Sequence, residues 1–168
     1  MQTLTRYLAG LFFVSVVSIA TAGEKIAILD YCDPTDPGWA PTGGCLLKDG
    51  DVTFAEFNDL LDSILSTAVV GHPAWRFEPS FVPIEEPNQT VRVTNLGGRS
   101  HTFTEVVEFG GGFVPPLNIG LTLAPECASA TVLVPGDKVE LRGLSAGDHR
   151  FQCCIHPWMR ALIKVEAD

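Results

Sequence analysis

The sequence predicts an all-β protein: an antiparallel β-sandwich that carries one helix near its N-terminus. The 168 residues include 16 Gly and 12 Pro, and such a composition favours short strands joined by many turns. From Pro79 onward the apolar residues alternate with a period of two, which is typical of strands with one buried face. Helical spacing occurs near residues 54–67. A chain of this length can form one domain with its own hydrophobic core.

The first 22 residues have the features of a cleaved export signal. Arg6 supplies a positive charge, residues 8–20 form an apolar run too short to span a bilayer comfortably, and Ala-Thr-Ala at residues 20–22 fits a cleavage site. The mature chain would then begin near Gly23; the alternative is an uncleaved membrane anchor. Export predicts a periplasmic or extracellular location, where disulfides persist, and no membrane contact beyond the signal.

Before residue 76 the sequence predicts one strand, one loop and the helix. Residues 25–31 form a short apolar run that suits an edge strand, and residues 33–44, with three Pro and three Gly, suit a loop. Thr53 followed by Glu56 is a capping box, which marks the start of a helix. Apolar residues then follow at helical spacing, so we expect the helix to run from about Phe54 to Thr67.

After residue 79 the sequence predicts a succession of strands with turns at close spacing, which favours an antiparallel sandwich. One long segment without strand patterning reaches from the three glycines at residues 110–112 to Cys127, and loops of such length are often functional. About eight strands are expected in all. Those after the helix are residues 80–84, 90–94 and 102–109, a hairpin of residues 131–134 and 139–141 around a Pro-Gly turn, and residues 148–153 and 161–165.

The chain has five cysteines, and an odd number in an exported protein indicates that one of them has another role. If Cys153 binds a metal, the other four can pair in three ways. We prefer Cys32 with Cys45, which closes a short loop and would contribute about 3 kcal/mol on the loop-entropy estimate. The remaining pair is then Cys127 with Cys154. This pair rests on the alternation of side chains in the strand directly before Cys154.

Side chains alternate along a strand, so His149, Phe151 and Cys153 share one face of the segment 148–153. Phe151 belongs in the core, and Cys153 therefore points inward at the end of the strand. Cys154 points away and is free for a disulfide. His149 is on the inward face but earlier in the strand, so we expect it to be buried far from the end that carries Cys153.

A cysteine, a histidine and a methionine follow one another at intervals of three residues: Cys153, His156 and Met159. Thiolate, imidazole and thioether ligands suit copper, and a blue-copper site needs two histidines, one cysteine and a weak axial methionine. His101, at the start of a neighbouring strand, is the candidate for the fourth ligand. The alternative is a disulfide-rich secreted domain in which Met159 and Trp158 merely belong to the core.

Residues 152–159, Gln-Cys-Cys-Ile-His-Pro-Trp-Met, resemble the C-terminal copper loop of the cupredoxins, most of all that of the amicyanin and plastocyanin-like branch. Residues 90–103 resemble the strand, loop and first ligand histidine of the same family. The resemblance covers about residues 81–165. It implies a Greek-key β-sandwich with one type 1 copper, and it carries the ligand roles onto His101, Cys153, His156 and Met159.

Under this resemblance the chain divides into a signal peptide (1–22), an N-terminal extension with the helix (23–75) and a cupredoxin domain (76–168). Many cupredoxins have an asparagine directly after the first ligand histidine, where its side chain braces the cysteine loop. This chain has Thr102 at that position, whose hydroxyl can brace the loop more weakly.

The resemblance implies a blue copper protein that carries single electrons, Cu(II)/Cu(I), to or from a redox partner such as a cytochrome or an oxidoreductase. The exposed ring edge of His156 would be the electron exit, with Trp158, Phe113 and two prolines as an apolar docking patch. The alternative is a copper delivery or storage module. We do not expect the protein to be an enzyme, because a multicopper oxidase needs more histidines than the four in this chain. The exception would be a red-copper-type open site completed by His72. The net charge of −9 argues against nucleic acid as a partner.

Overall fold

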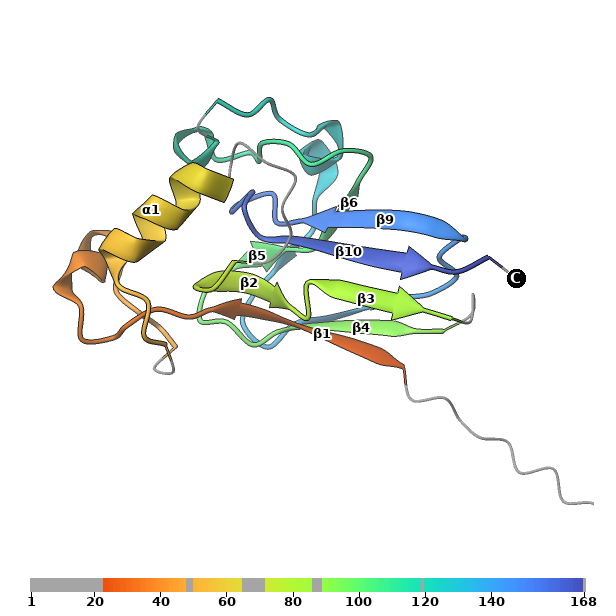
Figure 1. Ribbon diagram of the computed structural model, residues 1–168, viewed down its shortest axis with the longest axis horizontal. Coiled ribbons are helices and arrows are strands. Elements are labelled where there is room, and N and C mark those ends of the chain that lie inside the picture. The colour runs from red at the N-terminus through yellow and green to blue at the C-terminus, as the bar shows by residue number, and fades with distance from the viewer. Residues whose placement is uncertain (1–22, 48–49, 65–71, 86–88, 119, 168) are drawn as a thin grey trace, which may run out of the picture.

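The computed structural model describes residues 23–47, 50–64, 72–85, 89–118 and 120–167 (Figure 1). The predicted signal peptide and residues 65–67 of the predicted helix lie outside them. The described elements are β1 (Glu24–Asp30), η1 (Pro37–Thr42), α1 (Phe54–Ile64), β2 (Trp75–Glu78), β3 (Phe81–Ile84), β4 (Val91–Asn95), β5 (His101–Thr102), β6 (Thr104–Val106), η2 (Pro115–Leu117), η3 (Pro125–Ser129), β7 (Val132–Leu133), β8 (Lys138–Leu141), β9 (Gly147–Gln152) and β10 (Arg160–Val165).

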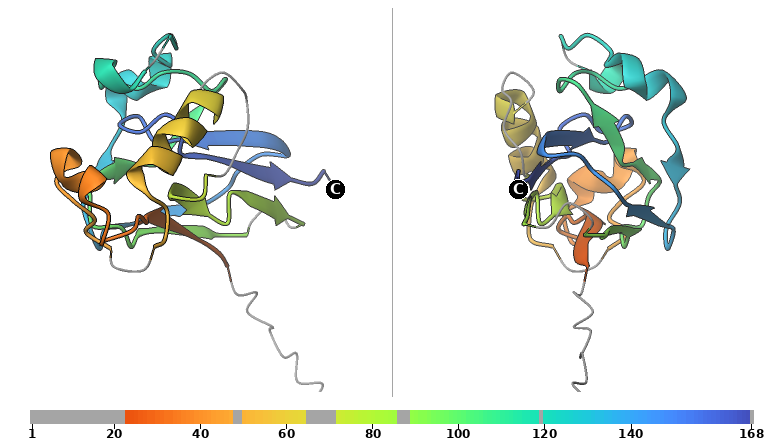
Figure 2. Two further views of the ribbon diagram at one scale, coloured as in Figure 1. Left: turned by 60° about the vertical axis from the view of Figure 1, so that its left-hand side comes forward. Right: turned by 90° about the vertical axis from the view of Figure 1, so that its right-hand side faces the viewer.

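The described strands form two four-stranded sheets that pack face to face, in the orders β2-β1-β4-β8 and β3-β10-β9-β6, and a small sheet of β5 and β7 (Figure 2). The chain passes from one large sheet to the other between β2 and β3, between β3 and β4, between β4 and β6, between β6 and β8, and between β8 and β9. These crossings give the Greek-key sandwich, so the predicted all-β class is confirmed. The other strand pairs are antiparallel as predicted, but β1 pairs with β4, and β3 with β10, in parallel.

The first strand of the fold, β1, lies between β2 and β4 and is not the edge strand that its sequence suggested. Its last three residues, Ile28, Leu29 and Asp30, are all buried, as expected for a strand covered on both faces. The edge belongs to β2, which sequence patterning did not predict. The expected boundary between residues 75 and 76 falls at the start of β2, so the segment before it contributes to the first sheet.

Two other strand predictions are wrong for a common reason. Each assigned to one hairpin or one strand residues that are adjacent in sequence but pair in different sheets. The expected hairpin of residues 131–141 does not form, because β7 pairs with β5 and β8 pairs with β4. The turn between them instead bonds to Asn95, whose carbonyl accepts from Gly136 N (2.8 Å) and whose N–H donates to Asp137 O (2.9 Å). The expected strand 102–109 divides into β5 and β6, which pair in different sheets.

The hydrophobic core lies between the two large sheets and continues beyond the end of the sandwich at which β9 ends and β10 begins. Buried apolar residues from both sheets form it, and burial of each large side chain contributes roughly 1.5–3 kcal/mol. Its members from the sheets include Ile26, Ile28, Phe77, Val82, Ile84, Val91, Val93, Phe151, Ala161, Ile163 and Val165.

Helix α1 covers that end of the sandwich (Figures 1 and 2). Its predicted capping box is present: the Glu56 carboxylate accepts from Thr53 N (2.9 Å), and Glu56 N donates to the Thr53 hydroxyl (3.3 Å). The apolar face of α1 is buried through Phe57, which contacts the rings of Trp39 (5.0 Å) and Trp75 (5.5 Å) between centroids. Aromatic packing therefore fixes α1 to the sheets. None of the helices in the described ranges has the length and apolar character needed to cross a bilayer.

We expect the substitution Phe57→Ala to lower the free energy of unfolding by about 3–5 kcal/mol, because it leaves a cavity among buried rings. Denaturant titration of the purified protein measures this. The matched control is Asn58→Ala, one residue along the same helix and exposed, which should change the free energy by less than about 0.5 kcal/mol. Equal effects of the two substitutions would contradict the packing role of Phe57.

Candidate metal centre

Three of the predicted ligands meet inside the protein. One ligand atom each from His101, Cys153 and His156 lies within 4.8 Å of the others. The Nδ1 atoms of the two histidines are 3.1 Å apart, and Cys153 Sγ lies 3.9 Å from His101 Nδ1 and 3.6 Å from His156 Nδ1. Metal bonds of about 2.0–2.3 Å to nitrogen and sulfur would reach all three atoms from one point. All three residues are buried, and this donor set suits one copper ion.

The loop between β9 and β10 presents two of these ligands. Cys153 N donates to Met159 O (3.0 Å), and Met159 N donates to His156 O (2.9 Å), so the loop closes on itself before β10 begins. The buried side chain of Arg160, the first residue of β10, holds the loop further by donating from Nε to Pro157 O (2.9 Å). Met159 is fully buried, and its role as the axial ligand stays a prediction.

Thr102 braces the cysteine from the neighbouring strand. Its backbone N–H donates to Cys153 Sγ (3.3 Å), and its hydroxyl accepts from Cys154 N (2.7 Å). Thr104 donates to the same hydroxyl oxygen (3.2 Å). The threonine that stands where many cupredoxins have asparagine therefore holds both residues of the Cys-Cys pair, as its position in the sequence suggested.

Sequence reasoning missed one buried group of this centre, Asp30. Its carboxylate oxygen Oδ2 lies 3.3 Å from His101 Nε2 and accepts from Arg99 N (2.8 Å), while Oδ1 accepts from Gly98 N (3.0 Å). Burial alone would raise the pKa of Asp30, but these hydrogen bonds, with that to His101 foremost, lower it below its ordinary value. The available signal was a carboxylate at the end of an otherwise apolar run.

The cysteine sulfur is poised to bind a metal as a thiolate. Burial alone would raise the pKa of Cys153, but hydrogen bonds with His101 and His156, and the charges of their rings, bring it well below its usual value. Burial would likewise lower the pKa of His101, whereas its hydrogen bonds to Asp30 and Cys153 raise that pKa to about 9. The lowered pKa favours the thiolate, which is the form of cysteine that binds metals.

Both predicted disulfides are present, Cys32–Cys45 and Cys127–Cys154. Among the five cysteines, all within the described ranges, Cys153 is the free one, and it is buried. Cys154 does point away from Cys153, but its side of β9 is not exposed. The irregular segment before η3 covers it, and Phe113 N donates to Cys154 O (2.8 Å). A side chain at Gly112 would collide with that carbonyl, so glycine permits the close approach.

Aromatic rings enclose the second histidine, so the prediction of an exposed ring edge on His156 is wrong. The residue is 7% exposed. Its ring lies against Trp75 (4.9 Å, edge-on) and Trp158 (5.3 Å), and Phe57 of α1 contacts both tryptophans at 5.5 Å. Trp158 is itself 1% exposed and cannot form the predicted docking patch. The reason is α1, which packs over this loop.

The other two histidines lie outside the metal cluster. His149 was expected deep on the inward face, but it is only partly buried, and its ring bonds to Glu105 Oε1 (2.6 Å) and to Ser145 O (2.8 Å). His72 is buried, and its Nδ1 accepts from Ala74 N (3.1 Å). His72 is not among the residues whose ligand atoms converge.

No protein-family model matches the chain, and no curated protein matches it. Among solved structures, the chain is similar to a purple cupredoxin from Nitrosopumilus maritimus, at 20% identity and a TM-score of 0.41, over 85% of this chain and 99% of that one. It is also similar to two amicyanin variants, one in the reduced state and one with Cu(I). They show 21% and 20% identity and TM-scores of 0.37, over 54% of this chain and 73% of theirs.

His72 predicts a pH dependence of stability. Burial, with a smaller contribution from the charge of Arg76, lowers its pKa from 6.5 to about 4. Between those values the unfolded chain takes up a proton that the folded protein does not, so stability falls as the pH drops from about 6.5 towards 4. We expect this residue to account for up to about 3 kcal/mol of the loss.

The variant His72→Asn tests this expectation, because its side-chain oxygen can replace the Nδ1 acceptor without titrating. Urea titrations from pH 7 to pH 4 should show a shallower loss of stability in the variant than in the wild type. Parallel pH profiles for the two proteins would contradict the assignment.

Proposed function

We propose that this protein binds one type 1 copper ion through His101, Cys153, His156 and Met159 and acts as a one-electron carrier. The observation that supports it is the buried sulfur of Cys153 between two imidazole Nδ1 atoms. Bound copper would supply the Cu(II)/Cu(I) couple, tuned by a weak axial thioether. The chain would supply a fixed, water-poor ligand set that changes little between oxidation states.

The enclosure of the ligands favours an electron carrier over a copper delivery module. All four residues are at most 7% exposed, and the loop that holds three of them is closed by backbone hydrogen bonds. Delivery requires the ion to leave rapidly, whereas electron transfer does not require any ligand to move. No enzymatic activity is proposed, since the chain has four histidines in all and His72 and His149 lie outside the cluster.

Export to a periplasmic or extracellular space is part of the same proposal, with the mature chain beginning near Gly23. Two disulfides among the described residues support it, because disulfides persist in oxidising compartments.

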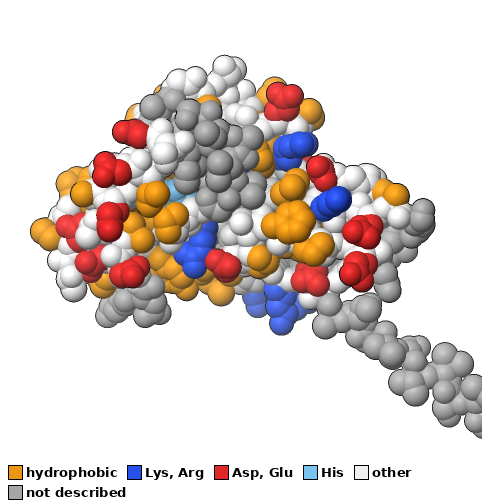
Figure 3. All heavy atoms as spheres, in the orientation of Figure 1, with side chains coloured by type: hydrophobic (Ala, Val, Ile, Leu, Met, Phe, Trp, Pro, Cys, Tyr) orange, Lys and Arg blue, Asp and Glu red, His pale blue; other side chains and the backbone are white. Residues whose placement is uncertain are grey.

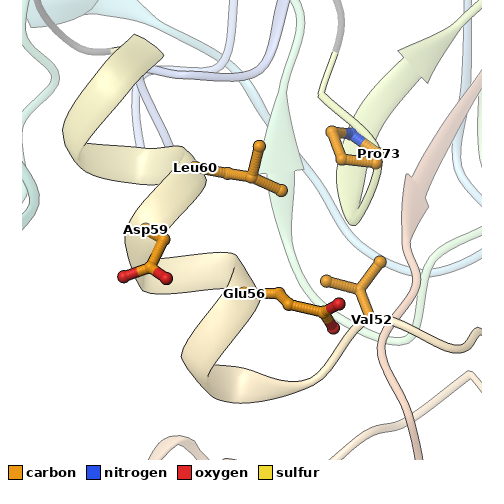
Figure 4. A pocket seen from close by; sticks show the side chains of 5 residues that line it. All are labelled: Val52, Glu56, Asp59, Leu60 and Pro73. Atoms are coloured by element: carbon orange, nitrogen blue, oxygen red, sulfur yellow. The ribbon is translucent and has the colours of Figure 1, made fainter.

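We further propose that the redox partner, a cytochrome or an oxidoreductase, carries positive charge and docks beside α1. A groove of about 430 Å³ lies there, lined by Val52, Glu56, Asp59, Leu60 and Pro73 (Figure 4). Pro73 is two residues from Trp75, the ring that contacts His156, so the groove adjoins a route from the centre to the surface. Acidic side chains are frequent over this part of the molecule (Figure 3), and such fields steer cationic partners.

Copper loading tests the central proposal. We expect the mature protein with one equivalent of Cu(II) to develop an intense visible absorption from the copper–thiolate bond, with a reversible one-electron couple. Cys153→Ser should abolish the absorption, whereas Cys32→Ser with Cys45→Ser should leave it in place. A wild-type protein that stays colourless with Cu(II) would refute the proposal, and rapid loss of copper to a chelator would favour delivery instead.

The docking proposal predicts a salt-dependent rate. With a basic cytochrome as the probe, Asp59→Lys should lower the bimolecular rate constant about three- to tenfold at low ionic strength, and the difference should vanish at high salt. Glu166→Lys is the matched control, because it makes the same charge change on an exposed residue close to the C-terminus in sequence. The end of β10 that leads to the C-terminus lies away from α1 (Figure 1). Equal rate losses in the two variants would contradict docking beside α1.

A further inference from the structure

The carboxylate of Asp30 is the one acidic group in contact with the ligand cluster among the described residues. It stands at the end of β1 and is 2% exposed. Its hydrogen-bond partners are one side chain, His101 through Nε2, and two backbone amides, Gly98 N and Arg99 N. In the described ranges no Lys or Arg side chain forms an ion pair with it. Because the carboxylate is buried, its charge acts on the neighbouring imidazole with little screening by solvent.

The geometry fixes how His101 presents itself. Its Nδ1 faces Cys153 Sγ (3.9 Å) and His156 Nδ1 (3.1 Å), and its Nε2 faces Asp30 Oδ2 (3.3 Å). A metal bound at Nδ1 requires the proton to be on Nε2, where the carboxylate accepts it. A carboxylate behind a ligand histidine fixes the tautomer and ring orientation and makes the ligand nitrogen more basic.

The loop before His101 is shaped to hold this carboxylate. Asn95 ties the loop together: its side-chain NH2 donates to Arg99 O (2.8 Å), and its side-chain oxygen accepts from Gly97 N (2.9 Å). A Cβ on Gly97 would lie 3.0 Å from Asp30 Oδ2, closer than ordinary contacts allow. Glycine therefore lets the backbone wrap the carboxylate, and the amides of the next two residues point at it.

From these contacts we propose that Asp30 is a positioning residue that locks His101 in its ligand orientation and biases the centre towards the oxidised ion. The inference rests on the proposed copper function. A negative charge hydrogen-bonded to a ligand stabilises the ion of higher charge, Cu(II), more than Cu(I). Asp30 thereby lowers the reduction potential of this centre relative to one whose histidine bonds to a neutral acceptor.

The test replaces the charge and keeps the shape. Asp30→Asn should weaken Cu(II) binding relative to Cu(I) binding at least tenfold, which raises the one-electron potential by at least about 59 mV. Asp30→Glu retains the charge, so its potential should lie much closer to that of the wild type than the potential of Asp30→Asn does. The control is Glu78→Gln on the neighbouring strand β2, exposed and paired with Arg76, which removes the same charge from the protein away from His101 and should barely move the potential.

A second measurement needs no variant. In the diamagnetic Cu(I) wild type, the His101 Nε2 proton should be visible by NMR and protected from exchange with water. The inference is overturned if that proton exchanges freely, or if Asp30→Asn keeps the wild-type potential. Either result, obtained on a protein that retains its copper–thiolate absorption, leaves the copper proposal intact. A wild type without that absorption refutes the copper proposal itself.

Discussion

The buried sulfur of Cys153, whose ionisation needs donors and positive charge around it, is the constraint on which the rest of this structure depends. Burial of Cys153 opposes its ionisation, so the fold must place donors around it. His101 and His156 supply the opposing charge, and the amide of Thr102 donates to the sulfur. These donors come from β5, in the small sheet, and from the loop after β9, in a large sheet, so the site exists only when these distant segments pack together.

The N-terminal segment also encloses the ligand cluster. It contributes β1 to the first sheet and α1 to the end of the sandwich. It brings Asp30 against His101, and Phe57 against Trp75, the ring that contacts His156. Asp30 acts on His101 through charge, whereas Phe57 closes the aromatic layer over His156 through Trp75. The segment 23–75, which the sequence suggested to be an extension outside the domain, thus contacts or encloses both ligand histidines. It is therefore part of the candidate metal centre.

Sequence patterns predicted correctly those features that depend on residues close together in the chain. The odd cysteine count indicated that one cysteine is free, and alternation along β9 correctly chose Cys153 over Cys154. The same reasoning failed for exposure and pairing. His156 is buried although it lies in a loop, and the strands flanking the turn at Gly136 pair with other strands. Exposure depends on which distant element covers a residue, and a local pattern carries no information about it.

The sequence by itself determined the donor types, their spacing in the C-terminal loop and the capped start of α1, and it favoured the disulfide pairs that the structure shows among three possible pairings. These follow from alternation, capping chemistry and counting, which act over a few residues. Only the tertiary structure decided that Asp30 lies behind His101 and that Trp75 covers His156. Those pairs are 71 residues and about 80 residues apart in the chain, and their meeting depends on the parallel pairing of β1 with β4 and on the docking of α1. Non-local strand pairing is selected by the packing of the whole core, because no short stretch of chain stabilises it alone.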